Sequence, residues 1–483
     1  MMRRFLAYFL SLTLLLSGCS GSPKNENSNP TGETDENSSS ISSISLPFIE
    51  GDSLNPYTVK SSLNIKIIPL LYDSLLTVDN SFGITPMLAE EIIKTDPLHI
   101  SIKIKEGVKF SNGEPLSSED VFFSFNQLKA MGSYFGKSLS VFSSAKISEN
   151  KIIFTLNYPD RYAENCLDFP ISSKKAGTAN PVGSGRYKLQ GKELVPNDNY
   201  LGASDFGIKK ISLTATAYSD SLFTAIKSGS IDIVPADLSL GSFTGTYSKT
   251  KIAHTSNLVY LGVGGTLSDL SLRKYISAAI NREEFSSKIP ASSFTASSLP
   301  LHPMKSEVFS LGLNNTKEKE NALDLLGKEY SLSKEKVLFK GEEKISLTLL
   351  YSNDNNEKTM IATKLSKLLA SAGIETKLIG KNYNEYLSLV SGGQFDLYLG
   401  EIRLPNSLNL NPLMSSSSEN LKTIYNGFCS GEKTTSEFLS TFSEELPFIP
   451  LMFKNSALVY SKAISNDLNL SVTDSYLSLQ NIR

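Results

Sequence analysis

Apolar and polar residues alternate along several short stretches of this chain, and this alternation predicts β-strands. Successive side chains of a strand point to opposite faces, so a half-buried strand shows a repeat of two. The predicted strands are Ile41–Ile49, Ile100–Lys105, Lys151–Leu156, Ile208–Ala217, Ile231–Val234, Leu258–Val263, Ile345–Tyr351, Ile374–Ile379 and Phe395–Leu399.

Other stretches repeat their apolar residues every three or four positions, which predicts helices with one buried face. The predicted helices are Leu63–Leu76, a helix that includes Val121–Phe125, Ser219–Ser228, Leu272–Ile280, Glu357–Ala372 and Tyr383–Val390. Pro69 lies inside the first of them, so we expect it to kink that helix or to mark its first turn. A serine before Val121 is suited to cap the next helix.

The order of these elements predicts the fold class. After Pro181 strands and helices alternate, and Ile345–Tyr351, Glu357–Ala372 and Ile374–Ile379 form one strand–helix–strand unit. Alternation of this kind is typical of α/β layers rather than of an all-α or all-β fold.

The N-terminus predicts export. Met1–Arg4 is basic, and the apolar run Phe5–Leu16 that follows is shorter than the roughly 20 residues that span a bilayer. Leu16–Cys19 then resembles the lipobox of bacterial lipoproteins. The resemblance implies cleavage before Cys19 and lipidation of its thiol, with residues 1–18 as the signal peptide. An ordinary secretory signal with a chance cysteine is the alternative.

Residues 19–43 are rich in serine and asparagine and contain almost no large apolar side chain. Such a segment cannot bury enough surface to fold by itself, so we expect a flexible tether. We therefore place the protein on the periplasmic side of a bacterial membrane or on the cell surface, with the bilayer as a partner through Cys19. Which membrane carries the anchor is left open.

Charge and composition exclude some classes of function. The chain has 483 residues and a net charge of −2, so it lacks the basic surface that nucleic-acid binding requires. Its three histidines, His99, His254 and His302, are scattered, and no cluster has metal-ligand spacing. No nucleophile elbow, phosphate loop or zinc motif is present. We predict neither an enzyme nor a resident cofactor.

A series of motifs resembles the family 5 extracellular solute-binding proteins of bacteria, the peptide/nickel class that serves ABC importers. Lys105–Leu116 (KEGVKFSNGEPL) with Asp120 and Val121 is similar to the pattern R-x-G-V-x-F-H-D-G-x-P-x-x-A-x-D-V. The other landmarks, in family order, are Leu54–Pro56, Leu71–Leu76, Thr85–Glu90, Val182–Tyr187, Asn197–Tyr200, Ser228–Asp232, Ala278–Glu283 with Arg273, and Leu446–Leu451.

The resemblance implies a two-lobed periplasmic-binding-protein fold with an extra domain inserted in lobe I. Lobe I would comprise residues 44–84, 178–257 and 456–483, the inserted domain 85–177 and lobe II 258–455. A short peptide would bind in the cleft, and hinge closure would present it to an ABC permease in the inner membrane. We expect a monomer. Cys166 and Cys429 would lie in different domains, which argues against a disulfide.

Two segments match the positions at which relatives pair with the backbone of a bound peptide. The first consists of Val59, Lys60, Ser61 and Ser62, and the second of Tyr398, Gly400, Glu401, Ile402 and Arg403. The glycine would let the ligand backbone approach closely. Together the segments are our predicted ligand-binding residues.

The chain departs from its relatives within the second segment. Relatives carry a tryptophan directly after the glycine and an amine-binding aspartate three residues later, where this chain has Glu401 and Leu404. Either Glu401 replaces that aspartate or the register shifts. Arg403 is suited to grip a carboxylate through paired hydrogen bonds. We hypothesise that both recognise a zwitterionic or short peptide.

Ligand identity and length stay open. The same fold would also accommodate a metal chelate, haem or a modified peptide such as glutathione, and a surface sensor or adhesin lipoprotein is a further alternative. Fold alone does not decide between them.

Overall fold

The structure is a computed structural model that describes residues 41–202, 205–216, 219–236, 248–287, 293–317, 321–393 and 395–482. Cys19 and the rest of the predicted signal and tether before residue 41 lie outside the described residues. Ser40–Arg483 forms one compact unit.

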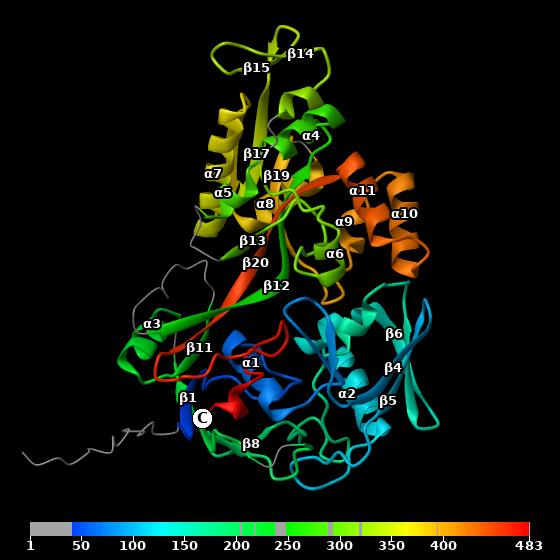
Figure 1. The fold of residues 1–483 in the computed structure, drawn as a ribbon, viewed down its shortest axis with the longest axis vertical. Helices are drawn as coiled ribbons and strands as arrows, with labels where there is room; N and C mark the ends of the chain where they lie inside the picture. The colour runs from blue at the N-terminus through cyan, green and yellow to red at the C-terminus, as the bar shows by residue number, and fades with distance from the viewer. Residues whose placement is uncertain are drawn as a thin grey trace, which may run out of the picture. The chain divides into compact units, whose positions relative to one another are not determined.

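A four-stranded sheet and one helix form the core nearest both ends of this unit. Its strands, in the order β1-β10-β9-β8, are β1 (Ser43–Phe48), β10 (Lys210–Ala215), β9 (Glu193–Pro196) and β8 (Tyr187–Gln190). The helix α1 (Ser62–Leu71) packs its apolar face into this core, which the C-terminal residues Ile464–Ile482 complete. Figure 1 shows β1, α1 and the C-terminus together in the lower part of the molecule.

A second four-stranded sheet lies beside this core and carries one helix. Its strands, in the order β4-β5-β7-β6, are β4 (Ala89–Asp96), β5 (His99–Ile104), β7 (Lys151–Leu156) and β6 (Phe142–Ser148). The helix is α2 (Ser118–Ala130), and the neighbouring small elements are β2 (Leu76–Val78), β3 (Ile84–Pro86), η1 (Phe135–Val141) and η2 (Ala163–Cys166). Ser117 precedes α2, and its backbone N–H and its hydroxyl both donate to the Asp120 carboxylate. A serine therefore occupies the N-cap position as predicted, but its hydroxyl donates to Asp120 and makes no cap bond to the helix backbone.

The largest sheet has seven strands, and in Figure 1 it extends from β17 and β19 in the upper part through β12 and β20 to β11 in the lower part. Six of them run in the order β11 (Ile233–Ala236), β20 (Phe448–Ser461), β12 (Ser248–Val263), β19 (Leu397–Arg403), β17 (Ser346–Ser352) and β18 (Glu375–Lys381), and β13 (Phe294–Ala296) pairs with β20. A separate small sheet consists of β14 (Tyr330–Leu332), β15 (Leu338–Lys340) and β16 (Glu343–Lys344).

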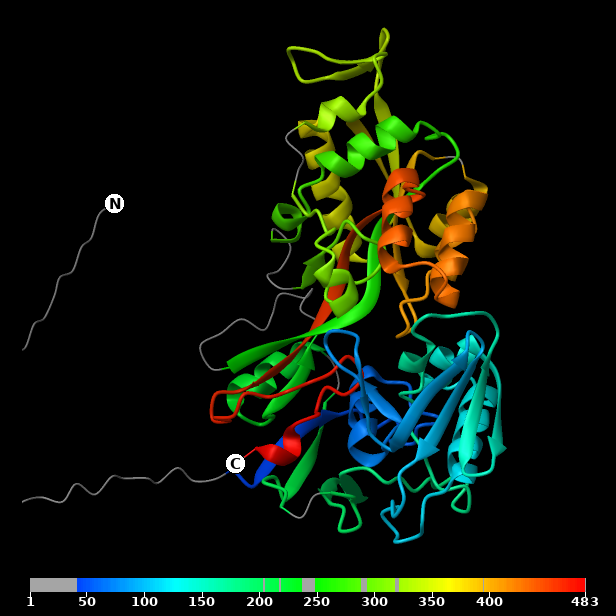
Figure 2. The same ribbon diagram turned by 45° about the vertical axis from the view of Figure 1, so that its right-hand side comes forward.

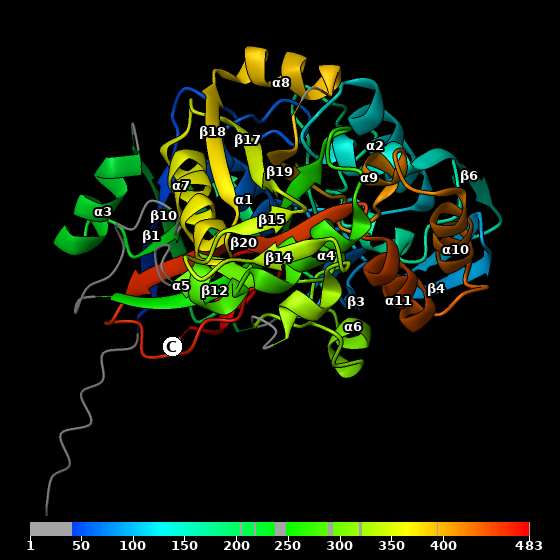
Figure 3. The same ribbon diagram turned by 90° about the horizontal axis from the view of Figure 1, so that it is seen from above.

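Helices cover this large sheet. They are α3 (Ser219–Ser228), α4 (Leu270–Ala279), α5 (Arg282–Ser287), α6 (Ser306–Ser310), α7 (Asn356–Ser371), α8 (Tyr383–Gly392), α9 (Asn411–Met414), α10 (Glu419–Ser430) and α11 (Thr435–Glu445), with the short turn η4 (Ala322–Leu325). A further short turn, η5 (Leu479–Asn481), belongs to the core around β1 and β10. Figure 3 shows α7 and α8 on opposite faces of the parallel strands β17 and β18. The predicted strand–helix–strand unit is therefore confirmed.

Two long antiparallel strands join the upper and lower parts of the molecule. β12 and β20 pair along most of their length, and both can be followed through the middle of Figures 1 and 2. Their register shifts between His254 and Leu258. A bulge of this kind locally disrupts the ladder and bends a strand, so it marks a natural point of flexure in an otherwise continuous ribbon.

Several predicted boundaries differ from the structure, and three of them bear on the site. The first helix ends at Leu71 rather than Leu76, because Pro69 has no N–H to donate and the Leu71 carbonyl accepts a bond from Gly185 instead. The strand predicted at Leu258–Val263 begins ten residues earlier, at Ser248. The strand predicted at Phe395–Leu399 is shifted to Leu397–Arg403, where it pairs with β12. Hydrogen bonds to segments far away in the sequence set these ends, so they cannot be predicted from the local periodicity of side chains.

Candidate ligand-binding cavity

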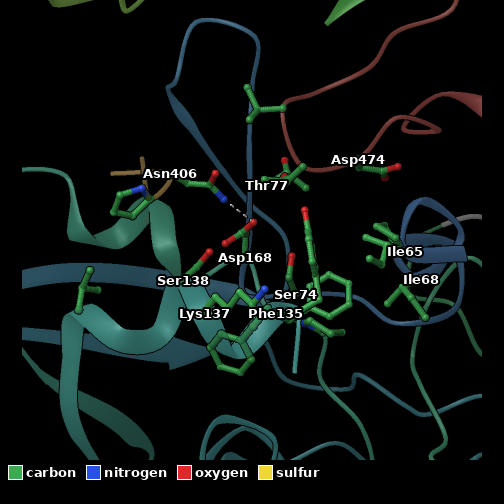
Figure 4. Close-up of a pocket in the computed structure, with 18 of the residues that line it drawn as sticks. Ile65, Ile68, Ser74, Thr77, Phe135, Lys137, Ser138, Asp168, Asn406 and Asp474 are labelled. Atoms are coloured by element: carbon green, nitrogen blue, oxygen red, sulfur yellow. Dashed lines mark hydrogen bonds between the residues drawn. The ribbon is translucent and has the colours of Figure 1, made fainter. Parts of the chain in front are cut away.

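A cavity of about 480 Å³ lies between segments that are far apart in the sequence. We call α1 with residues 72–77, η1 with its flanks, residues 168–170 and residues 472–474 the cavity floor. Residues 403–412, which are the last residue of β19 and the segment after it, form the cavity roof. Figure 4 shows Asp168 of the floor beside Asn406 of the roof. Its size is typical of a pocket that encloses a small organic ligand.

Local hydrogen bonds fix α1 in the floor. Ser61 accepts a bond from the Asn64 backbone at the helix start. The buried Asn64 side chain binds the backbone of Ile49 and Asp52 and so ties the helix to the preceding loop. Helical geometry then turns Ile67 and Leu71 into the core, while Lys66 and Pro69 line the cavity.

Three aspartates line the cavity, and each has a different environment. Asp474 is fully buried and forms an ion pair with the equally buried Arg186 at 2.5 Å. Asp73 is buried and accepts a bond from the Ser184 hydroxyl, but its Oδ1 has no partner among the described residues. Asp168 accepts a bond from the Asn406 amide at 2.9 Å, across the cavity from floor to roof.

Burial decides the charge of two of these carboxyls. It raises the pKa of Asp73 to about 7, although the nearby Arg186 opposes the shift. Burial also raises the pKa of Asp168 to about 7, where Arg403 acts in the opposite direction. A carboxyl in so little water prefers its neutral form. Both groups therefore exchange protons near neutrality, and both can donate or accept a hydrogen bond to a ligand.

Cations face the same space. Arg403 enters from the roof, and its guanidinium lies 5.0 Å from the centre of the Tyr134 ring, a cation–π contact with the floor. Lys66 enters from α1, and Lys137 lies at the exposed edge. The cavity thus offers groups suited to both ends of a zwitterion.

Of the predicted binding residues, only Arg403 lines this cavity. Val59 is buried in the core, Lys60 and Ser61 precede α1, and Ser62 is the first residue of this helix. The backbone N–H groups of Lys60 and Ser61 donate to the Asp52 carboxylate. These N–H groups already have partners within their own loop.

The other predicted residues lie along β19, outside the cavity lining. Gly400 faces Tyr260 on β12, and a side chain there would overlap the Tyr260 ring. This close approach is intramolecular. The ring of Tyr398 packs against the same Tyr260, with 5.8 Å between centres, and Ile402 pairs with Leu258 in the ladder.

Glu401 belongs to an ion cluster. Its carboxylate contacts Lys358, lies 3.7 Å from Lys454 and accepts a bond from Asn257 at 3.4 Å. Lys454 also pairs with Glu357 at 2.9 Å. Two lysines thus compete with any ligand ammonium for Glu401.

Sequence reasoning missed the floor residues Lys66, Asp73 and Asp168. One signal was present: Lys66 is a lone cation among Ile65, Ile67 and Ile68, on a helix otherwise apolar at these positions. Asp168 had no comparable local signal, because the charge that it meets is more than two hundred residues away.

Further features bear on other classes of function. Within the described ranges no group of three or more His, Cys, Asp or Glu could hold a metal ion. None of the helices in that same part of the chain is long and apolar enough to cross a membrane. Cys166 and Cys429 are both buried free thiols.

The sequence of this chain is similar to a family model and to characterised bacterial proteins. A family model described as "Bacterial extracellular solute-binding proteins, family 5 Middle" matches residues 83–420. The oligopeptide-binding protein AppA of Bacillus subtilis is 24% identical over 420 residues, which are 77% of this chain and 75% of the relative. Protein XP55 of Streptomyces lividans is 24% identical over 339 residues, which are 65% of this chain and 62% of the relative.

Solved structures share the fold. A nickel ABC transporter structure from Bacillus halodurans has a TM-score of 0.72 at 18% identity and covers 87% of this chain and 95% of its own. The murein tripeptide-binding protein MppA, in its unliganded open form, has a TM-score of 0.70 at 15% identity, covering 87% and 93%. AppA of Bacillus subtilis, in complex with a nonapeptide, has a TM-score of 0.56 at 19% identity, covering 91% and 98%. The predicted two-lobed α/β fold is confirmed.

Proposed function

We propose a function from one premise: this chain belongs to the bacterial extracellular solute-binding proteins of family 5, whose model matches residues 83–420. In this proposal the chain captures a short peptide in the cavity and delivers it to an ABC-type permease. Members of such a family bind solutes and need no catalytic group. The extra domain at residues 85–177 and the lobe boundaries predicted above are part of the proposal.

The observation that carries this proposal is a cavity with groups of both charges between floor and roof. A peptide with free ends is a zwitterion, and Arg403 on one side and Asp73 and Asp168 on the other suit its two ends. A volume of about 480 Å³ favours a short ligand. AppA, a relative, is an oligopeptide-binding protein.

Arg403 is the proposed direct contact among the residues that the sequence singled out. Glu401 already pairs with Lys358 and Lys454, so its contribution to ligand binding would be indirect. The segment Val59–Ser62 and the backbone of Tyr398–Ile402 remain proposed contacts for a longer extended ligand.

A lipid anchor at Cys19 completes the proposal. The mature chain would be held at the outer surface of a membrane by acyl chains, with residues 19–43 as the tether, and would meet its permease there as a monomer. Several acyl chains anchor a protein firmly, whereas one alone does not.

Native mass spectrometry of the full chain purified from its membrane fraction tests both the lipid anchor and the bound peptide. We expect a mass that includes acyl chains after loss of residues 1–18, together with a co-purified peptide. A co-purified metal chelate or haem would replace the peptide assignment. The absence of acyl mass would remove the anchor and leave the ligand assignment unaffected.

Substitution at Arg403 tests the direct contact. Arg403→Ala removes charge-assisted hydrogen bonds worth roughly 1.5–3 kcal/mol, so we expect affinity for the identified ligand to fall about 10- to 100-fold by calorimetry. Glu401→Ala should reduce it less. If both variants bind as tightly as the wild type, the assignment of β19 to the ligand is wrong.

A further inference from the structure

Two cations reach the same cavity from opposite sides. Lys66 extends from α1 in the floor, and Arg403 comes from the end of β19 in the roof. These two elements lie in different parts of the molecule. The helix α1 packs in the core around β1 and β10, whereas β19 is a strand of the seven-stranded sheet. A group that touches both side chains would therefore connect the two parts that border the cavity.

Lys66 has no hydrogen bond or ion pair to any described residue. It is partly buried among isoleucines, and burial lowers the pKa of its ammonium to about 8. The Arg403 charge lowers that pKa further, which places the two cations within reach of each other's field. Asp474 attracts Lys66, but Asp474 already forms an ion pair with Arg186 at 2.5 Å.

Arg403 is also incompletely neutralised. It stacks on Tyr134, and the acidic group that interacts with it, Asp168, is engaged by Asn406. Since burial favours the protonated form of Asp168, this carboxyl balances Arg403 only in part near neutral pH. Lys137 adds a third cation at the exposed edge.

We propose that Lys66 and Arg403 form a two-sided anion site that binds the terminal carboxylate of the peptide and thereby draws floor and roof together. The inference rests on the proposed function and specifies which part of the peptide binds there. In the empty cavity the two like charges repel each other and disfavour approach. A carboxylate between them turns that repulsion into two attractive contacts, so it binds the closed arrangement more tightly than the open one.

Calorimetry with trialanine, its C-terminal amide and its N-acetyl derivative tests the site. We expect the free acid to bind at least about tenfold more tightly than the amide, as befits a charge-assisted contact. Lys66→Gln should abolish most of that preference, and Lys66→Arg should retain it. Lys227→Gln is the matched control, because it removes the same charge from an exposed position on another helix, α3, outside the cavity lining.

The outcomes separate this inference from the proposed function. Equal binding of acid and amide, or an acid preference that survives in Lys66→Gln, overturns the anion site while peptide binding stands. If no trialanine derivative binds the wild type, the anion site is tested by thermal unfolding in acetate, which carries a carboxylate, and in acetamide, its neutral counterpart. A rise in melting temperature specific to acetate, lost in Lys66→Gln and kept in Lys227→Gln, supports the anion site. Equal shifts in wild type and Lys66→Gln overturn it.

Discussion

Individual residues at the cavity show that burial, more than residue type, sets their charge. Asp73 and Asp474 are both buried aspartates in the floor. Asp474 has a full ion pair with Arg186, whereas one oxygen of Asp73 has no partner in the described structure. An unpaired buried carboxylate is costly, and the free energy is lowest when the group takes up a proton. Asp73 therefore behaves as a neutral acid where a surface aspartate would be charged.

The stability of the protein should depend on pH through Asp73. Its folded pKa of about 7 lies above its ordinary value of 3.8, so the native state holds a proton that the unfolded chain releases. Unfolding then releases protons across this window, and the contribution of Asp73 to stability is lost as pH rises from about 4 to 7. Asp73→Asn has no carboxyl group to titrate, so the variant should not show this loss of stability with rising pH. We expect the variant to gain up to about 4 kcal/mol relative to wild type between these limits, measured by urea unfolding.

Comparison of the two proteins at each pH cancels other titrating groups, including His254 and His302, whose pKa values burial lowers. Asp324→Asn is the control, because Asp324 is exposed at the surface, outside the cavity lining. A difference between wild type and Asp73→Asn that stays constant with pH would contradict the assignment.

At the scale of elements, α1 is held by a close contact with a glycine-containing turn. Gly183 and Gly185 pack against the last turn of α1, and the Gly185 N–H donates to the Leu71 carbonyl at 3.0 Å. The chain can follow this path only because glycine has no side chain. The contact ends the helix and so sets the positions of Tyr72 and Asp73 in the cavity floor.

Gly185→Ala should therefore destabilise the protein. A Cβ there would overlap the backbone of Leu70 and Leu71, and overpacking of this kind costs roughly 1–3 kcal/mol. Urea unfolding measures the change. Gly51→Ala is the matched control, since a Cβ at Gly51 meets no atom within 4 Å. Equal effects of the two substitutions would show that the contact is relaxed easily and does not fix α1.

At the scale of the whole molecule, the segment around Tyr162 packs against the helices of the upper part. Glu307 of α6 forms an ion pair with Arg161 at 3.2 Å and also contacts the hydroxyls of Tyr162 and Thr435. Ser407 of the roof donates to Asp160 at 2.8 Å. The buried core continues from this segment into the seven-stranded sheet. These contacts hold floor and roof at their present separation.

Glu307→Gln should weaken ligand binding without touching the cavity. The variant loses the ion pair with Arg161 and weakens the bonds to two hydroxyls, which lowers the stability of the present arrangement of floor and roof. We expect a fall in peptide affinity of about 3- to 10-fold by calorimetry, since a ligand that selects one arrangement loses the free energy by which that arrangement is destabilised.

Glu419→Gln serves as its control, because the Glu419 side chain is 91% exposed and pairs with Lys422 at the surface. Lower thermal stability with unchanged affinity in Glu307→Gln would mean that these contacts persist whether or not ligand is bound.

Much of the fold was predictable because its determinants are local. The strand–helix–strand unit from β17 to β18 could be predicted from the periodicity of its side chains and from Gly373, which ends the helix. The start of α2 could be predicted from Ser117 and Asp120 alone. These interactions join residues a few positions apart, so a single sequence contains all the participants. The family motifs extended the prediction to the two-lobed fold.

The cavity was predictable only in part. Sequence motifs led to Arg403, which lines it, and also to Gly400 and Glu401, which the structure engages with Tyr260, Lys358 and Lys454. Whether a residue of β19 contacts a ligand or another residue of the protein depends on which strand pairs with β19, and the sequence motifs do not contain this information.

The sequence by itself determined the class of fold, the family and most element positions, because periodicity and capping act between near neighbours. Only the tertiary structure decided which charges share the cavity. Arg186 and Asp474 are 288 positions apart, and Lys66 and Arg403 come from different cores. Burial and Coulomb interaction act through space, so the charge state of these groups follows from distances that the order of residues does not record.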